Sequence, residues 1–126
     1  MMTPQDRALI MVYESVKHRL TIGVVEYLEA LKDWEVVPLT EDGQVIGGVL
    51  LKGNEIHVGY GVKPKRSIRA YIRTILGGVV DKYGWAVTQV QEENHAGLRF
   101  CERLGFVKFG AQNGTILLRC DRSNYA

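Results

Sequence analysis

The feature that most constrains the fold is a helical segment followed at once by a strand in the middle of the chain. Apolar residues recur at helical spacing between Ser67 and Tyr83, at Ile68, Ile72, Ile75, Leu76, Val79 and Tyr83 itself. Gly84 ends this pattern, and the segment Trp85–Gln91 then has the composition of a strand. A further strand is predicted just before the helix, at Glu55–Val62. A strand–helix–strand unit of this kind favours an α/β domain.

The remaining segments predict hairpins and additional helices around that unit. Strands are predicted at Glu35–Leu39 and Gln44–Lys52 and in a closing hairpin of Phe106–Phe109 and Thr115–Cys120. One helix begins at Thr3-Pro4, and another is Asn94–Leu104. A helix between the first helix and the first strand is capped by Thr21, and its apolar face consists of Val24, Val25, Leu28 and Leu31. Pro38 cannot donate to a ladder, so the first strand is expected to lie at an edge or to end there. Hairpins combined with the strand–helix–strand unit predict an α/β (α+β) fold with a mixed sheet and helices on its faces.

Composition limits the class of protein. The chain has 126 residues, 46% hydrophobic and 24% charged, which predicts a single globular domain over residues 1–126. A net charge of +2 does not by itself indicate nucleic acid, and no apolar run is long enough to predict a membrane span. Cys101 and Cys120 lack metal-ligand spacing, so no metal is expected, and they suggest reduced thiols in a cytoplasmic protein.

Positive charge gathers between the strand at Glu55–Val62 and the following helix. Lys63, Lys65, Arg66, Arg69 and Arg73 lie within this short stretch. The first N–H groups of a helix have no partner within it, and the helix dipole is positive there, so the junction is suited to bind an anion. Two alternatives stay open: a solvated basic helix start, and contact with nucleic acid phosphates, which no interleaved aromatic residues support.

Two segments together resemble the GNAT superfamily of N-acetyltransferases. They are "GYGVKPKRSIRAYIRTILGGVVDKYG" and "ENHAGLRFCERLGF", and the resemblance runs from about Gln44 to Cys120. It implies the GNAT-like acyl-CoA N-acyltransferase fold with the first strand missing or shortened. It also implies transfer of an acetyl group from acetyl-CoA to an amine, on a small molecule or a protein.

The resemblance also implies which residues meet the cofactor. These would be Tyr60, Val62, Lys65, Arg66, Ser67, Ile68, Arg69, Ala70 and Asn94. The loop departs from the family pattern, because Ser67 and Arg69 stand where the family has glycines, whose backbone is open to phosphate oxygens. Their side chains could obstruct the pyrophosphate, or Arg69 could bind it by charge.

Three residues are candidates for catalysis. The family uses a base, often Glu or His, to take the proton of the amine, and Glu55 and His57 could serve, since they lie two apart on one side of a strand. Cys101 stands where the family usually has a Tyr that protonates the leaving thiolate. The alternatives are that Glu55 and His57 are half-exposed strand residues, and that Cys101 is a small residue packed on the apolar stripe. No local signature pairs Cys101 with His18, His57 or His95.

Two functions therefore remain open at the level of sequence. The first is an acetyl-CoA-dependent N-acetyltransferase of unknown amine substrate. The compact chain without a first strand, and its pattern Asn94-His95 followed by Arg99-Phe100, also resemble small GNAT-like proteins of tailed bacteriophages. This second, fainter resemblance implies a catalytically degenerate structural or assembly protein in the host cytoplasm. The closing hairpin offers strand edges that could pair between subunits, so a homo-oligomer is a further hypothesis.

Overall fold

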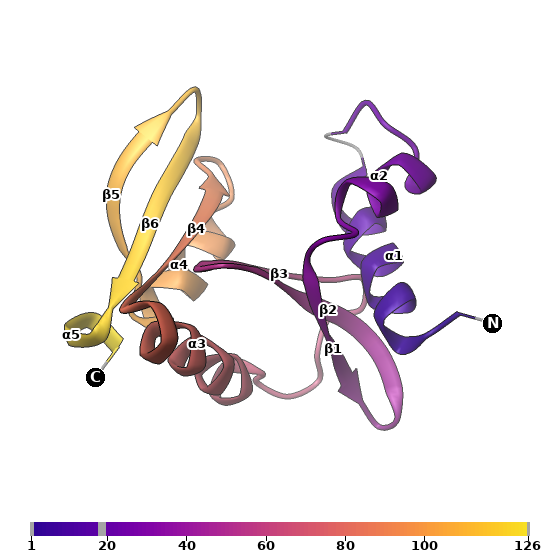
Figure 1. Ribbon diagram of the computed structural model, residues 1–126, viewed down its shortest axis with the longest axis horizontal. Helices are drawn as coiled ribbons and strands as arrows, with labels where there is room; N and C mark the ends of the chain where they lie inside the picture. Colours follow the sequence, from indigo (N-terminus) through magenta and orange to yellow (C-terminus); the bar gives the residue numbers. More distant parts are fainter. Residues whose placement is uncertain (1, 18–19, 126) are drawn as a thin grey trace. The chain divides into compact units, whose positions relative to one another are not determined.

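The computed structural model describes residues 2–17 and 20–125, and His18 lies outside this range. The elements, in chain order, are α1 (Pro4–Val16), α2 (Val24–Ala30), β1 (Glu35–Glu41), β2 (Gln44–Lys52), β3 (Glu55–Tyr60), α3 (Arg69–Tyr83), β4 (Trp85–Gln91), α4 (His95–Leu104), β5 (Val107–Gln112), β6 (Thr115–Asp121) and α5 (Arg122–Tyr125) (Figure 1). The strands form a six-stranded sheet in the order β1-β2-β3-β4-β6-β5. The β3–β4 pair is parallel, whereas β1–β2, β4–β6 and β5–β6 are antiparallel. The predicted mixed sheet is confirmed, and no strand precedes α1 within the described residues.

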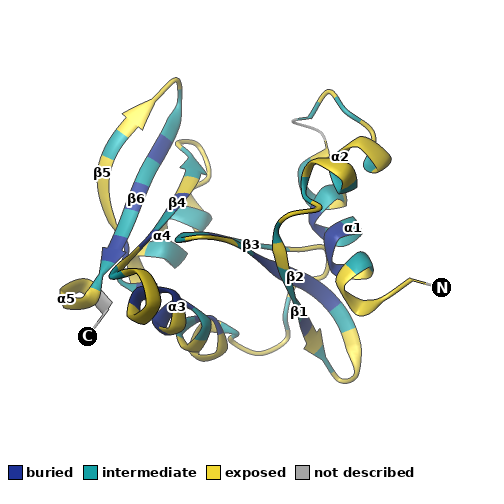
Figure 2. Cartoon of the chain, in the orientation of Figure 1, coloured by how far each residue is buried: buried dark blue, intermediate teal, exposed yellow. Residues whose placement is uncertain are grey.

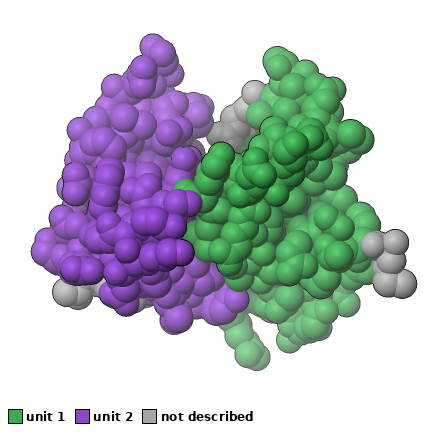
Figure 3. Space-filling view, viewed as in Figure 1, with its two compact units in different colours: residues 1–52, 57–67 green, residues 53–56, 68–126 purple. Residues whose placement is uncertain are grey.

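The chain divides into two compact units (Figure 3). Unit 1 comprises Met1–Lys52 and His57–Ser67, and unit 2 comprises Gly53–Ile56 and Ile68–Ala126. The prediction of one domain over residues 1–126 stays a prediction.

Unit 1 has its core between α1 and the β1–β2 hairpin. Thr3 caps α1 in a reciprocal arrangement, in which its hydroxyl accepts from the N–H of Asp6 and the Asp6 carboxylate accepts from the N–H of Thr3. Leu9 and Val12 of α1 are buried together with Leu50 of β2. Buried stretches, in dark blue, are visible on both α1 and β2 in Figure 2. Partly buried residues pack against this cluster, namely Leu28, Leu31, Trp34 and Val36. Helix α1 therefore lies on the hairpin by its buried apolar residues.

The prediction for the second helix is wrong in two respects. Gly23, and not Thr21, is the N-cap of α2, and the N–H of Tyr27 donates to the Gly23 carbonyl. Val25 is 75% exposed, although it was placed on the apolar face. One residue turns a helix by about 100°, so Val25 leaves the stripe that Leu28 and Leu31 follow.

Unit 2 is built on β4, β6 and β5 with α3 packed against β4. The β4–β6 register places Ala86 opposite Cys120 and Thr88 opposite Leu118, and all four side chains are buried. Ile72, Leu76, Val79 and Val80 of α3 are buried as well. One side of this part of the sheet is therefore a buried core. Helix α5, which the sequence did not predict, contacts β6 and α3.

Several predicted boundaries move where the chain leaves the sheet. Helix α3 begins at Arg69 and not at Ser67, because Ile68 has φ −96° and ψ 2°, outside the helical range. Strand β3 ends at Tyr60 and not at Val62. Both Gly61 and Val62 donate their N–H groups to the carbonyl of Ile46, at 2.9 and 3.4 Å, so the regular ladder stops there. The closing strands run further than predicted, to Gln112 and Asp121.

Candidate functional site

The loop between β3 and α3 presents the predicted cofactor residues to solvent. Lys65, Arg66 and Ser67 are exposed and Ile68 is half-buried, while Arg69 and Ala70 form the exposed first turn of α3. No side chain caps this helix start by a hydrogen bond, and its first turn contains no acidic residue. Tyr60 and Val62, just before the loop, are 42% and 51% exposed. The junction is thus accessible and positive, as a binding site for an anion requires.

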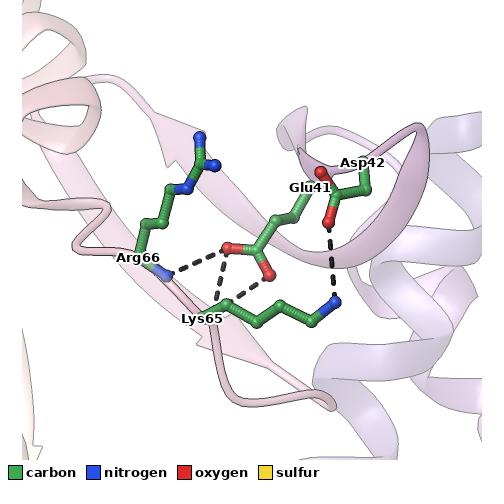
Figure 4. Close-up of polar contacts among 4 residues, drawn as sticks. All are labelled: Glu41, Asp42, Lys65 and Arg66. Carbon is green, nitrogen blue, oxygen red and sulfur yellow. Dashed lines mark hydrogen bonds and ion pairs between the residues drawn. The ribbon is translucent and has the colours of Figure 1, made fainter.

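The loop already binds an anion that belongs to the chain itself. The backbone N–H of Lys65 donates to both carboxylate oxygens of Glu41, each at 3.0 Å (Figure 4). The backbone N–H of Arg66 donates to Glu41 Oε2 at 3.2 Å. Beside this contact, Lys65 Nζ lies 3.6 Å from Asp42 Oδ2. Glu41 is the last residue of β1, so the tip of the β1–β2 hairpin is tied to the loop within unit 1.

The sequence did not indicate Glu41 as a functional residue. It lies in a turn signal, Glu41-Asp42-Gly43, and Asp42 and Gly43 have φ angles of 53° and 78°, as the tight hairpin turn requires. Its partners are 24 and 25 residues further along the chain. A hairpin pattern predicts the turn but not what its tip will contact.

These hydrogen bonds lower the pKa of the Glu41 carboxyl below its ordinary value of 4.5, chiefly through the N–H of Lys65 and then that of Arg66, with the charges of both residues adding to the effect. Because the pKa is depressed in the folded state, the stabilisation is fully present above pH 4.5 and is lost as the pH falls through the folded-state pKa.

We expect wild-type protein to lose more stability than Glu41→Gln between pH 6 and pH 3. Glutamine cannot supply a charge to the loop, so the variant lacks this part of the acid sensitivity. Chemical unfolding of both proteins across this range would measure the difference. Parallel losses in the two proteins would show that the carboxylate charge contributes nothing to the fold.

The two candidate bases lie in β3. Glu55 and His57 are both half-buried, and Ile56 between them is buried, in keeping with the alternation of side chains along a strand. The centroid of the His57 ring lies 5.6 Å from that of Trp34, and Lys52 Nζ lies 5.9 Å from the same Trp34 centroid. Glu55 is paired in register with Val87 of β4. A role for either residue as a base stays a prediction.

Asn94 is confirmed as the N-cap of α4. Its side-chain oxygen accepts from the N–H of Gly97 at 3.0 Å, which satisfies one of the unpaired donors of the first turn. Gly105 ends the helix with φ 110°, and a Cβ there would also lie 2.7 Å from the carbonyl oxygen of Asn124. The contact of Asn94 with the cofactor stays a prediction.

Cys101 is half-buried on α4. Burial raises the pKa of its thiol to about 11, and the negative charge of Glu102 adds to the shift. Burial likewise raises the pKa of Cys120, which lies in the core of unit 2. Neither thiol therefore has the low pKa of a reactive cysteine at neutral pH. A part for Cys101 in proton transfer stays a prediction.

The described residues hold neither a candidate metal site nor a candidate membrane span. No group of three or more His, Cys, Asp or Glu side chains in residues 2–17 and 20–125 could hold a metal ion. No helix in the same residues combines the length and apolar character needed to cross a membrane.

The fold is that of the GNAT N-acetyltransferases. The ribosomal-protein-alanine N-acetyltransferase of Brucella melitensis is 12% identical, with a TM-score of 0.72 over 95% of this chain and 96% of that one. A GNAT family acetyltransferase of Elizabethkingia anophelis with acetyl-CoA bound is 13% identical, with a TM-score of 0.63 over 89% and 88% of the two chains. The spermidine N-acetyltransferase of Vibrio cholerae, in complex with CoA and spermine, is 17% identical, with a TM-score of 0.63 over 82% and 78%.

No protein-family model matches the sequence, and no curated protein matches it either. At such low identities the neighbours establish the fold alone. The predicted alternative, a catalytically degenerate assembly protein of a phage, gains no support from them. The homo-oligomer and the cytoplasmic location stay predictions.

Proposed function

We propose that this protein is an acetyl-CoA-dependent N-acetyltransferase that acts on an amine. The observation that carries the proposal is the loop before α3, whose N–H groups at Lys65 and Arg66 hold a carboxylate. A backbone arranged to donate to anionic oxygens, among exposed cationic side chains, suits the pyrophosphate of coenzyme A. Two proteins of the same fold support this choice, because one holds acetyl-CoA and the other holds CoA.

In the proposed reaction the amine nitrogen attacks the thioester carbonyl, the new N–C bond forms, and the C–S bond breaks. Glu55 or His57 would take the proton that the amine loses. The departing thiolate regains a proton from solvent, which balances the proton that the amine loses to the base. An ordinary alkyl thiol has a pKa of about 8.5, so a donor whose pKa is about 11 transfers its proton uphill. In our proposal Cys101 therefore packs on the apolar stripe of α4 and does not supply this proton.

Coenzyme A would be held by the loop and the first turn of α3. Arg66 and Arg69 would meet the phosphates by charge, and Arg69 would do so from a place where the family loop has bare backbone. Asn94 would lie beside the pantetheine arm while it caps α4. The acceptor is an amine of unspecified class, since the sequence carries no recognisable specificity motif.

Thermal unfolding with acetyl-CoA tests the proposal. A ligand at a hundred times its Kd stabilises the folded state by about 2.7 kcal/mol, which raises the Tm of a domain of this size by several degrees. We expect such a rise at millimolar acetyl-CoA, a smaller rise in Arg66→Ala, and an undiminished rise in the control Arg103→Ala, which removes an exposed arginine from the last turn of α4. If neither the wild type nor Glu41→Ala shows a rise in Tm, the proposal is contradicted.

A further inference from the structure

The carboxylate of Glu41 occupies the donors that the proposed cofactor would need. We propose that Glu41 is a built-in competitor of the cofactor pyrophosphate for the N–H groups of Lys65 and Arg66, so that acetyl-CoA binds only when the β1–β2 hairpin tip releases the loop. This inference rests on the proposed function and assigns it a regulatory contact within unit 1.

The hydrogen bonds explain why the two anions exclude each other. Glu41 accepts from Lys65 with both oxygens and from Arg66 with one, at 3.0 to 3.2 Å. Each backbone N–H has a single hydrogen, and it cannot make a full-strength bond to a second oxygen. A phosphate brought to the same two donors would also meet a negative carboxylate at contact distance, where like charges repel. One of the two anions must leave.

The contact can be released at small cost. All three hydrogen bonds are exposed to solvent, so water replaces them when they break. The neighbouring ion pair of Lys65 with Asp42 has side chains that are 80% and 70% exposed, and exposed pairs of this kind contribute little to stability. The hairpin tip is therefore attached mainly by the Glu41 carboxylate.

The competition has a predictable effect on affinity. A ligand that binds only the open form has an apparent Kd equal to its intrinsic Kd divided by the fraction of molecules that are open. If Glu41 leaves the loop open in about a tenth of the molecules, removal of its side chain should strengthen binding about tenfold. Substitution elsewhere on the hairpin should leave affinity unchanged.

Calorimetric titration with CoA tests this in four proteins: wild type, Glu41→Ala, Glu41→Gln and Asp42→Asn. Asp42→Asn is the matched control, because it also removes one negative charge beside Lys65 but leaves the backbone donors occupied. Asparagine tolerates the positive φ of this position, so the turn should be kept. We expect Kd to fall about tenfold in Glu41→Ala, less in Glu41→Gln, whose amide oxygen can still accept, and less than twofold in Asp42→Asn.

Carbon NMR of the Glu41 carboxyl group follows the contact directly in wild-type protein. In the free protein this carboxyl should titrate below the ordinary range of a glutamic acid, and saturation with CoA should return it towards that range. A carboxylate with a purely structural role would keep its titration unchanged when CoA binds. The signal is assigned by its loss in Glu41→Gln.

The outcomes separate this inference from the proposed function. Equal and measurable CoA affinity in wild type and Glu41→Ala overturns the competition and leaves the N-acetyltransferase proposal standing. An equal gain in Asp42→Asn also overturns it, because general charge would then explain the effect. Absence of CoA binding in all four proteins overturns the proposed function and the competition together.

Discussion

Gly47→Ala is expected to lower the free energy of unfolding by about 3 kcal/mol, at the upper end of what overpacking a protein interior costs. A Cβ at this position would lie 2.2 Å from the carbonyl oxygen of Gly59 and 2.6 Å from the Cα of Tyr60. Real side chains do not approach so closely, and the obstructing atoms are mostly backbone. Strand β3 would have to move away from the new Cβ of residue 47.

The surroundings of Gly47 limit that movement. The N–H groups of Gly61 and Val62 are bonded to the carbonyl of Ile46, one residue before Gly47. On the other side, a Cβ at Gly59 would meet Val12 of α1 at 3.1 Å, so the helix already rests closely on this backbone. Relaxation at Gly47 therefore disturbs both the end of β3 and the core of unit 1.

Gly78→Ala is the matched control. Gly78 lies inside α3, it is exposed, and a Cβ there would meet nothing within 4 Å. Alanine in an exposed helix interior is more favourable than glycine by about 0.8 to 1 kcal/mol, so this variant should be stabilised. Urea unfolding of both variants gives the comparison. A Gly47→Ala protein as stable as the wild type would contradict the close approach of Gly47 to the backbone of Gly59 and Tyr60.

The regular elements could be predicted from the sequence where local chemistry determines them. Strands β2 and β4 have the predicted boundaries, because turn residues or a helix-ending glycine bound their apolar runs. Helix α4 begins and ends as predicted, since Asn94 and Gly105 are its cap and its stop. These features depend on neighbours within a few residues, and such neighbours are visible in a sequence.

Contacts between distant segments were not predictable in the same way. Gly47 of β2 approaches the backbone of Gly59 and Tyr60 in β3 closely, and no local pattern in the sequence indicates this contact. The contact of Glu41 with the loop depends on where the hairpin tip and the loop come together in the fold. The sequence therefore indicated a positive loop, and only the structure shows that a carboxylate of the same chain occupies it.

Cys101 is expected to react slowly with iodoacetamide in the native protein, with a rate that still rises at pH 9.5. A thiol with a pKa of about 11 has about a hundredfold less thiolate at neutral pH than one with the ordinary value of 9.0. Because thiolate nucleophilicity rises with pKa, the net retardation from ionisation is about tenfold, and partial burial slows the reaction further. The rate should therefore increase tenfold per pH unit without levelling off.

Cys120→Ser isolates Cys101 for this measurement, and mass spectrometry of the alkylated peptide identifies the site. The same protein in urea supplies the control, since an unfolded cysteine should react faster at neutral pH and its rate should level off near an ordinary pKa. A native rate that levels off below pH 8 would mean a stabilised thiolate at Cys101 and would make this residue a candidate nucleophile. A rate that rises throughout agrees instead with a cysteine on the apolar stripe of α4, where burial keeps the thiol protonated and leaves the chemistry to other groups.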